Sequence, residues 1–194
     1  MTKKDRMSNL KDLTWEHHKD AERQDFVKVL MSGKIHPEFY ATYLWNQHLK
    51  YDLLEALISV TGKINHIPDL YRKQYILKDY LELWPHEEPP KTMQSTYNYV
   101  AHLKNIMTDA QALLGHVYVL HMGDLSGGQM IARKAPGAGR MYKFDGDVKE
   151  TKELIRALTN DDMADEARAC FEFSTQLFRD LMELDVEHYL EQTD

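Results

Sequence analysis

The sequence has little of what a disulfide-bonded, membrane-spanning or β-rich protein needs. Cys170 is the single cysteine in 194 residues, which excludes an internal disulfide and a cysteine-rich metal site. No run approaches the roughly 18 apolar residues that span a bilayer, and the N-terminal residues lack the apolar stretch of a signal peptide. Only six prolines occur, and strand-like alternation of Val, Ile and Thr is scarce. We therefore expect a cytoplasmic, all-α protein without a membrane anchor.

Acidic residues outnumber basic ones, with 31 Asp and Glu against 24 Lys and Arg and a net charge of −7. This balance disfavours nucleic-acid binding, because phosphates attract positive surfaces. The length suits one core, so we expect residues 1–194 to form a single domain. Ten histidines are many for this length and weakly suggest a metal or haem, although scattered surface histidines are the simpler explanation.

Apolar residues recur at helical spacing along most of the chain. The pattern predicts about seven or eight helices, the clearest spanning residues 5–23, 37–60, 68–83, 93–107, 116–135, 149–158 and 161–190. Gly33 is expected just after a helix end, and Pro37 at a first helical position. Leu81 and Tyr97 are expected to point inward, and residues 140–147 to form a loop or short extended segment.

The predicted helix over 116–135 contains three glycines, which are Gly123, Gly127 and Gly128. Each costs about 0.5–1 kcal/mol relative to alanine, so this helix should bend, fray or pass very close to something flat. Gly123 and Gly127 lie four residues apart and share one face. Asp124 and Ser126 place a carboxylate and a hydroxyl beside that bare face. A glycine-rich loop between two helices is the alternative interpretation.

Several chemistries fit this glycine-rich segment poorly. A phosphate-binding loop would need a Lys-Ser/Thr ending, and Asp124 would repel phosphate. A hydrolase using Ser126 would need a sharp strand-to-helix elbow, which the pattern does not predict. A di-iron bundle would need repeated Glu-x-x-His motifs. A flat macrocycle such as haem matches a bare helical face best.

Haem also needs an axial ligand on its other side, and the first predicted helix offers His17 and His18. Periodicity would bury His17 and half-expose His18. Glu22 lies one turn after His18 and could hydrogen-bond its second ring nitrogen, whereas Ala21 offers His17 nothing. Both histidines could instead be partly buried helix residues without a ligand role.

Haem propionates need cations, and Lys152 and Arg156 lie four residues apart on one helix face. Lys11 lies one heptad before the second of the two histidines and on its side. A solvated charged face is the ordinary alternative. Phe171 and Phe178, also one heptad apart, could line a haem pocket or simply belong to the core.

Three segments resemble the biliverdin-producing haem oxygenases. The sequence GDLSGGQ at 123–129 resembles the family signature, and the preceding His116-Val-Tyr118 resembles its His-x-Tyr lead. The segment His18-Lys-Asp-Ala-Glu22, followed by Phe26, resembles the family's proximal His-x-x-Ala-Glu. The resemblance runs from about residue 10 to residue 184, and the seven-residue signature is specific.

The resemblance implies a multi-helix fold in which haem lies between the first helix and a kinked, glycine-rich helix. It implies His18 as the iron ligand, with Glu22 as its hydrogen-bond partner. It implies Gly123, Gly127 and Asp124 as the catalytic groups of the opposite wall. The remaining haem-binding positions that it implies are Lys11, Tyr118, Ser126, Gly128, Lys152, Arg156, Phe171, Ser174 and Phe178.

The implied reaction cleaves haem at a meso carbon, usually α, to biliverdin, with release of ferrous iron and carbon monoxide. It consumes O2 and electrons from an external reductant. A ferredoxin is the expected donor, with a flavoprotein reductase as the alternative, and a bilin reductase is a candidate downstream partner. The chain ends at Asp194 without an anchor helix, as in the short soluble members of bacteria, plastids and phages. The expected compartment is the cytoplasm, the host cytoplasm for a viral protein or the stroma for a plastid one.

Two positions depart from the family pattern. Leu120 stands where the family often has an arginine, and Trp15 where it often has a second basic residue. The polar network near Asp124 and the grip on the propionates are therefore expected to differ. A haem-storage protein on the same fold and an all-α hydrolase remain the alternatives from other functional classes.

Overall fold

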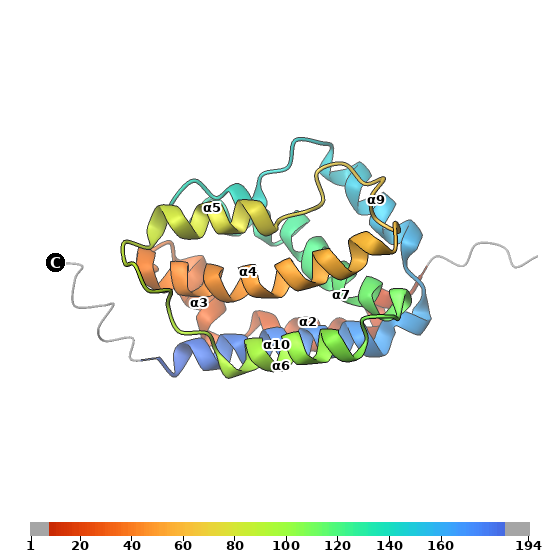
Figure 1. The fold of residues 1–194 in the computed structure, drawn as a ribbon, viewed down its shortest axis with the longest axis horizontal. Coiled ribbons are helices and arrows are strands. Elements are labelled where there is room, and N and C mark those ends of the chain that lie inside the picture. Colours follow the sequence, from red (N-terminus) through yellow and green to blue (C-terminus); the bar gives the residue numbers. More distant parts are fainter. Residues whose placement is uncertain (1–7, 185–194) are drawn as a thin grey trace, which may run out of the picture.

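Helices account for all the regular secondary structure of residues 8–184, the part of the chain that the computed structural model describes (Figure 1). This confirms the predicted all-α class. The α-helices are α1 (Leu10–Leu13), α2 (Trp15–Glu22), α3 (Asp25–Ser32), α4 (Pro37–Val60), α5 (Lys73–Leu83), α6 (Gln94–Asn105), α7 (Ala110–Leu125), α8 (Gly128–Ile131), α9 (Val148–Leu158) and α10 (Ala164–Met182). Two short 3₁₀ helices, η1 (Arg140–Tyr142) and η2 (Asp161–Met163), complete the described part.

Local capping signals fix several helix ends where the sequence predicts them. Gly33 follows α3 with φ of 75°, a left-handed conformation that glycine adopts without strain. Pro37 opens α4, and the His36 side chain accepts a hydrogen bond from the backbone N–H of Glu38. Asp147 caps α9 by accepting from the N–H groups of Lys149 and Glu150.

The prediction of one continuous helix over residues 5–23 is wrong. The helix breaks at Thr14, whose hydroxyl donates to the Leu10 carbonyl at 2.8 Å, so that α1 and α2 are separate. Its expected start at Asp5 lies outside the described residues, as does the expected end of the last helix at Leu190. Within residues 8–184, the last helix, α10, ends at Met182.

The helix expected from residue 68 begins instead at Lys73. The Glu55 carboxylate of α4 accepts hydrogen bonds from the backbone N–H groups of Arg72 (2.5 Å) and Lys73 (3.1 Å). These bonds satisfy donors at the start of α5 that would otherwise have no partner. A cap supplied from 17 residues upstream has no local sequence signal.

Two expected core residues are exposed. Leu81 is 63% accessible and Tyr97 is 58% accessible, so both predictions are wrong. In α6, polar residues lie on the inward face instead. Thr96 is buried and its hydroxyl donates to Asn46 of α4, and Ser95 is buried with its backbone N–H donating to Asp180 of α10. Periodicity cannot detect such polar contacts between helices.

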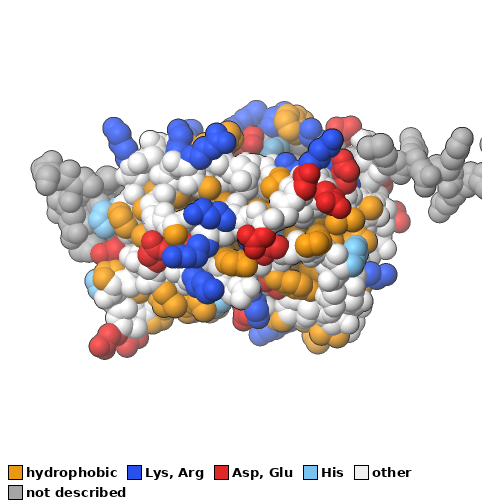
Figure 2. All heavy atoms as spheres, turned by 90° about the horizontal axis from the view of Figure 1, so that it is seen from above, with side chains coloured by type: hydrophobic (Ala, Val, Ile, Leu, Met, Phe, Trp, Pro, Cys, Tyr) orange, Lys and Arg blue, Asp and Glu red, His pale blue; other side chains and the backbone are white. Residues whose placement is uncertain are grey.

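Helix α10 contacts more of the fold than its position at the end of the described chain suggests. It packs against α2, α3, α6 and α7, while α4 packs against α5, α6 and α7 (Figure 1). On the face in Figure 2, seen from above the view of Figure 1, Lys and Arg side chains are interspersed with Asp and Glu. No helix within residues 8–184 is both long enough and apolar enough to cross a membrane.

The long helix α4 carries a buried cation. Lys50 is 1% accessible, and its Nζ has no hydrogen-bond partner among residues 8–184. The nitrogen lies 5.0 Å from the centre of the Tyr99 ring. Burial lowers the pKa of Lys50 from 10.5 to about 8, although the nearby Cys170 and Asp124 oppose the change. The protein therefore keeps a poorly compensated charge in its core.

Replacing Lys50 with methionine would remove this charge at similar side-chain length. We expect Lys50→Met to raise the free energy of unfolding at neutral pH by roughly 1–3 kcal/mol, measured by urea denaturation. The folded pKa lies below the unfolded one, so wild-type stability rises as the pH increases from about 8 to 10.5. The advantage of the variant should shrink across that interval. A constant advantage would contradict the proposed cause.

Candidate functional site

The glycine-rich segment forms two helices with a bend between them. Helix α7 ends at Leu125, the backbone turns at Ser126 with φ of −115° and ψ of −93°, and α8 begins at Gly128. The prediction of one helix over 116–135 is therefore wrong, because the bend expected at the glycines interrupts the helix and separates α7 from α8. Ser126 and Met130 are exposed.

Gly123 and Gly127 present bare backbone to open space. A Cβ added at Gly123 would meet nothing within 4 Å, and one at Gly127 would meet only the Gly123 carbonyl at 4.0 Å. Both residues are exposed. Packing within residues 8–184 thus gives no reason for glycine at either position. Close approach of a ligand would give one.

Gly128 differs from the two glycines before it. A Cβ at this position would lie 2.5 Å from Cδ1 of Tyr142, so the tyrosine ring fills the space of a side chain. Gln129 anchors the same turn by donating to the carbonyls of Asp124 and Tyr142. Gly128 therefore has a packing role, toward η1, that the resemblance does not indicate.

Alanine substitutions at Gly123 and Gly128 should have opposite effects on stability. In the protein without added ligand, Gly123→Ala should raise the free energy of unfolding by up to about 1 kcal/mol, because alanine favours the helix and meets no neighbour. Gly128→Ala should lower it by about 1–3 kcal/mol through the clash with Tyr142. Urea denaturation of the two variants measures both values. Destabilisation by Gly123→Ala would show that its open face is occupied.

Asp124 lies beside the bare face but points into the core. It is 5% accessible, and the Tyr51 hydroxyl of α4 donates to its Oδ2 at 2.7 Å. Burial raises the pKa of Asp124 to about 7, and the nearby His121 and the Tyr51 bond only partly oppose this. The carboxyl group can therefore hold or release a proton near neutral pH.

A second buried pair of polar residues, His121 and Glu55, lies next to Tyr51 and Asp124. His121 of α7 lies with Nε2 3.1 Å from Oε1 of Glu55, and its ring is 5.2 Å from the Tyr51 ring. Leu120, where the resemblance leads one to expect a cation, is buried. Sequence reasoning missed Tyr51 and Glu55, because they reach α7 only through the packing of α4 against it. It also missed His121, which lies one turn before Asp124 on α7 and whose partner Glu55 comes from α4.

An asparagine at position 124 should stabilise the protein above neutral pH. The folded pKa exceeds the unfolded value of 3.8, so wild-type stability falls as the pH rises from about 4 to about 7. Asn keeps an oxygen that can accept from Tyr51 but cannot ionise. We expect Asp124→Asn to be about 2–4 kcal/mol more stable than wild type at pH 8, with little difference near pH 4. Denaturation at both pH values tests this, and equal stability at pH 8 would contradict the raised pKa.

The two candidate histidines on α2 face different neighbours. Their side chains are similarly half-exposed, 33% for His17 and 39% for His18, so the expectation that His17 is buried is wrong. His17 pairs with the exposed Glu172 carboxylate at 3.2 Å. The His18 ring lies 5.6 Å from the Phe171 ring, and its Nε2 lies 3.2 Å from Glu22. Only His18 adjoins an apolar wall.

That wall is the half-buried row of α10. Phe171, Ser174 and Phe178 are each partly accessible, although the neighbouring Cys170 and Leu177 are fully buried. Phe178 stacks on Phe26 of α3 with ring centres 5.6 Å apart. Helices α2 and α7 both pack on α10 but make no extensive contact with each other within residues 8–184. A flat apolar ligand between them would cover this row.

The predicted propionate-side residues come from three helices. Tyr118 of α7 is half-buried, and burial raises its pKa, while the charge of Arg156 on α9 opposes the rise and that of Asp12 on α1 adds to it. Helix α9 packs on α7, and a charge on α1 also acts on Tyr118. Lys11 is exposed and its Nζ lies 6.0 Å from the Trp15 ring, and Lys152 is half-buried on α9.

A groove also lies elsewhere, on the His17 side of α2. It has a volume of about 330 Å³ and is bordered by Glu16, Asp20, Glu172 and Arg179 among others. Its carboxylates would repel the propionates of haem, and it adjoins neither glycine. We therefore place the candidate site between His18 and the glycine face rather than in this groove.

Comparison with known proteins shows which family the chain is similar to. Residues 5–180 match a family model described as "Heme oxygenase". The chain is 29% identical to heme oxygenase 1 of Synechocystis over 202 residues, covering 90% of this chain and 83% of that protein. It is 28% identical to heme oxygenase 2 of Rattus norvegicus, covering 89% of this chain but only 64% of the rat protein, so it spans less than two thirds of that relative.

Solved structures show the same fold. The crystal structure of heme oxygenase-1 from the cyanobacterium Synechocystis sp. PCC6803 in complex with heme aligns with a TM-score of 0.80 and 25% identity over 94% of each chain. A heme oxygenase structure from Leptospira interrogans aligns with a TM-score of 0.76 and 27% identity, covering 87% of this chain and 96% of that one.

Proposed function

The chain belongs to the haem oxygenase family, and from this premise we propose that it binds haem as its substrate and cleaves it at a meso carbon to biliverdin. Ferrous iron and carbon monoxide are the other products, and O2 and external electrons are consumed. The observation that carries the proposal is the buried Asp124, whose pKa burial raises to about 7, beside two glycines that have no packing partner within residues 8–184. A carboxyl group that can hold or release a proton near neutral pH favours turnover over haem storage, which requires no proton transfer.

The residues present fit a haem held between α2 and α7. His18 would supply an imidazole to the iron, and Glu22 already pairs with that ring. The exposed faces of Phe171 and Phe178 would pack on the macrocycle. The backbone at Gly123 would form the opposite wall.

Cations complete the fit at the edge of the macrocycle. Lys11, Lys152 and Arg156 would pair with the two propionates, with Tyr118 beside them. These contacts would set the rotation of haem in the site and so decide which meso carbon is attacked. We propose the α position because the family resemblance implies it.

Haem supplies the oxygen-activating chemistry, and the chain supplies orientation and protons. Because Gly123 and Gly127 have no side chains, their backbone can lie close to the reacting face of the ligand. Asp124 delivers protons there, with Tyr51 holding the carboxyl group in position. In place of the arginine expected at Leu120, the buried His121–Glu55 pair supplies the polar surroundings.

Electrons must come from another protein, which we propose is a ferredoxin, with a flavoprotein reductase as the alternative. The basic residues Lys11, Lys152 and Arg156 would attract an acidic donor to the haem edge. A bilin reductase would consume the product.

His18 and His17 form a matched pair of positions for testing the proposal. Haem added to wild-type protein should give a Soret band, and a reductant in air should then convert it to a bilin absorption. His18→Ala should reduce haem affinity and bilin formation by more than about tenfold, since even partners of metal ligands are worth 10–100-fold. His17→Ala should leave both nearly unchanged.

Each other result has a defined meaning. Disruption by His17→Ala but not by His18→Ala would overturn the ligand assignment. A stable Soret band without bilin formation would indicate haem storage. No spectral change on adding haem would favour an all-α enzyme acting on another substrate.

A further inference from the structure

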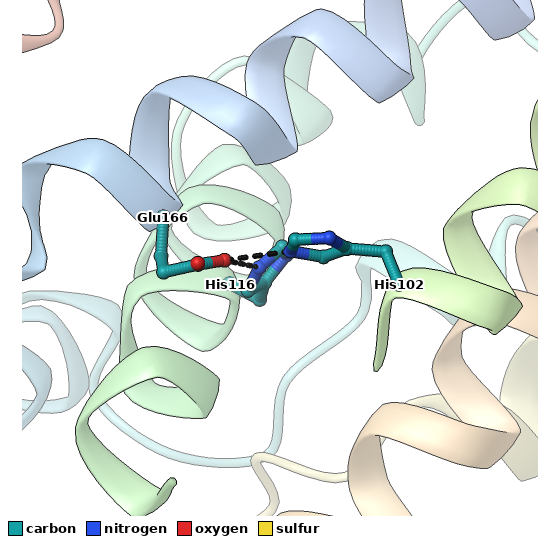
Figure 3. A group of neighbouring side chains, drawn as sticks. All are labelled: His102, His116 and Glu166. Carbon is teal, nitrogen blue, oxygen red and sulfur yellow. Dashed lines mark hydrogen bonds and ion pairs between the residues drawn. The ribbon is translucent and has the colours of Figure 1, made fainter. Parts of the chain in front are cut away.

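A second group of metal-ligating side chains lies where α6, α7 and α10 meet. His102, His116 and Glu166 each contribute one side chain, and Figure 3 shows all three pointing toward a common centre. Nε2 of His102 is 2.7 Å from Oε2 of Glu166, and Nε2 of His116 is 2.9 Å from the same oxygen. All three candidate ligand atoms lie within 4.8 Å of one another.

These separations resemble those between ligands of one metal ion. Metal bonds from imidazole nitrogen and carboxylate oxygen are about 2.0–2.2 Å long, which puts neighbouring ligand atoms roughly 3 Å apart. A cation could enter with a small outward movement of the side chains. His102 and Glu166 have the freedom for it, because each is 27% exposed, whereas His116 is fully buried. Water can reach the open side and complete the coordination.

Neighbouring groups orient the potential ligands. The Tyr99 hydroxyl lies 3.1 Å from Nδ1 of His116, so the other ring nitrogen faces Glu166. The Phe173 ring packs 5.2 Å from the His102 ring. Partners of this kind commonly fix metal-binding imidazoles.

Helix packing brings Glu166 to the two imidazoles. A Cβ at Gly115 would be 3.2 Å from the Glu166 Cβ, so this glycine allows α10 to bring the carboxylate close to α7. Within residues 8–184 the ion pairs of Glu166 are with the two imidazoles alone. Against the effect of burial, Cys170 and Glu166 raise the pKa of His116 to about 9, so a metal ion would bind by displacing the proton of that ring.

We propose that His102, His116 and Glu166 bind one divalent transition-metal ion of the Zn²⁺ type. Two imidazoles and one carboxylate form a ligand set that such ions accept, with water filling the remaining positions. The site is separate from the one around His18. On α7, His116 precedes Gly123 by seven residues, or about 10 Å along the helix.

Zn²⁺ titration of the haem-free protein, followed by isothermal calorimetry, tests the site. Wild type should bind one ion per chain. His102→Ala and Glu166→Gln should each weaken binding by more than about tenfold, the glutamine variant keeping the shape of the side chain while removing its charge. Both variants avoid the fully buried His116. Circular dichroism verifies that they are folded.

Two control variants separate this site from other histidines. His86→Ala removes a surface histidine that pairs with Glu38 at 3.1 Å but has no third ligand, and His18→Ala removes the candidate haem ligand. Neither should change the affinity.

The same samples titrated with Co²⁺ should show a visible ligand-field band that is lost in Glu166→Gln. The proposal is overturned if wild type shows no saturable binding. It is also overturned if both site variants bind as wild type does, or if His18→Ala alone abolishes binding.

Discussion

The packing of α10 against α2 on one side and α7 on the other is the contact on which the rest of the structure depends. It places His18 against Phe171 and holds α2 away from the glycine face of α7. Because both walls rest on one helix, a planar ligand between them meets a rigid floor. The face of α10 between these two helices is only partly covered by other residues, because Phe171 and Phe178 remain partly accessible.

Helix α4 contributes polar groups that lower stability but serve the site. Lys50, Tyr51 and Glu55 are all nearly inaccessible, and an apolar helix would pack more favourably. Tyr51 and Glu55 use their buried positions to hold Asp124 and His121. The raised pKa of Asp124 follows directly from this desolvation. Sites that need a proton near neutral pH commonly retain such destabilising burial.

Features governed by neighbouring residues could be predicted from the sequence. Gly33 and Pro37 mark helix boundaries because their backbone preferences act locally, and the all-α class follows from apolar spacing. The bend at the glycines is predictable for the same reason, because glycine disfavours the helix. Contacts between residues far apart in the sequence could not be predicted. For example, nothing in the residues at the start of α5 indicates that Glu55 caps this helix. Nor did the helical pattern reveal that Tyr142 occupies the space beside Gly128.

Gly115 has none of the prominence of the signature glycines, yet it sets the spacing between two helices. Backbone atoms of Met163 and Ala167 would lie 3.2–3.3 Å from any Cβ at this position. A single methyl group there would act as a wedge, moving α10 away from α7 along their shared length. Since α10 also carries Phe171 and Phe178, the wedge would alter the width of the cleft that we propose for haem, from a position outside that cleft.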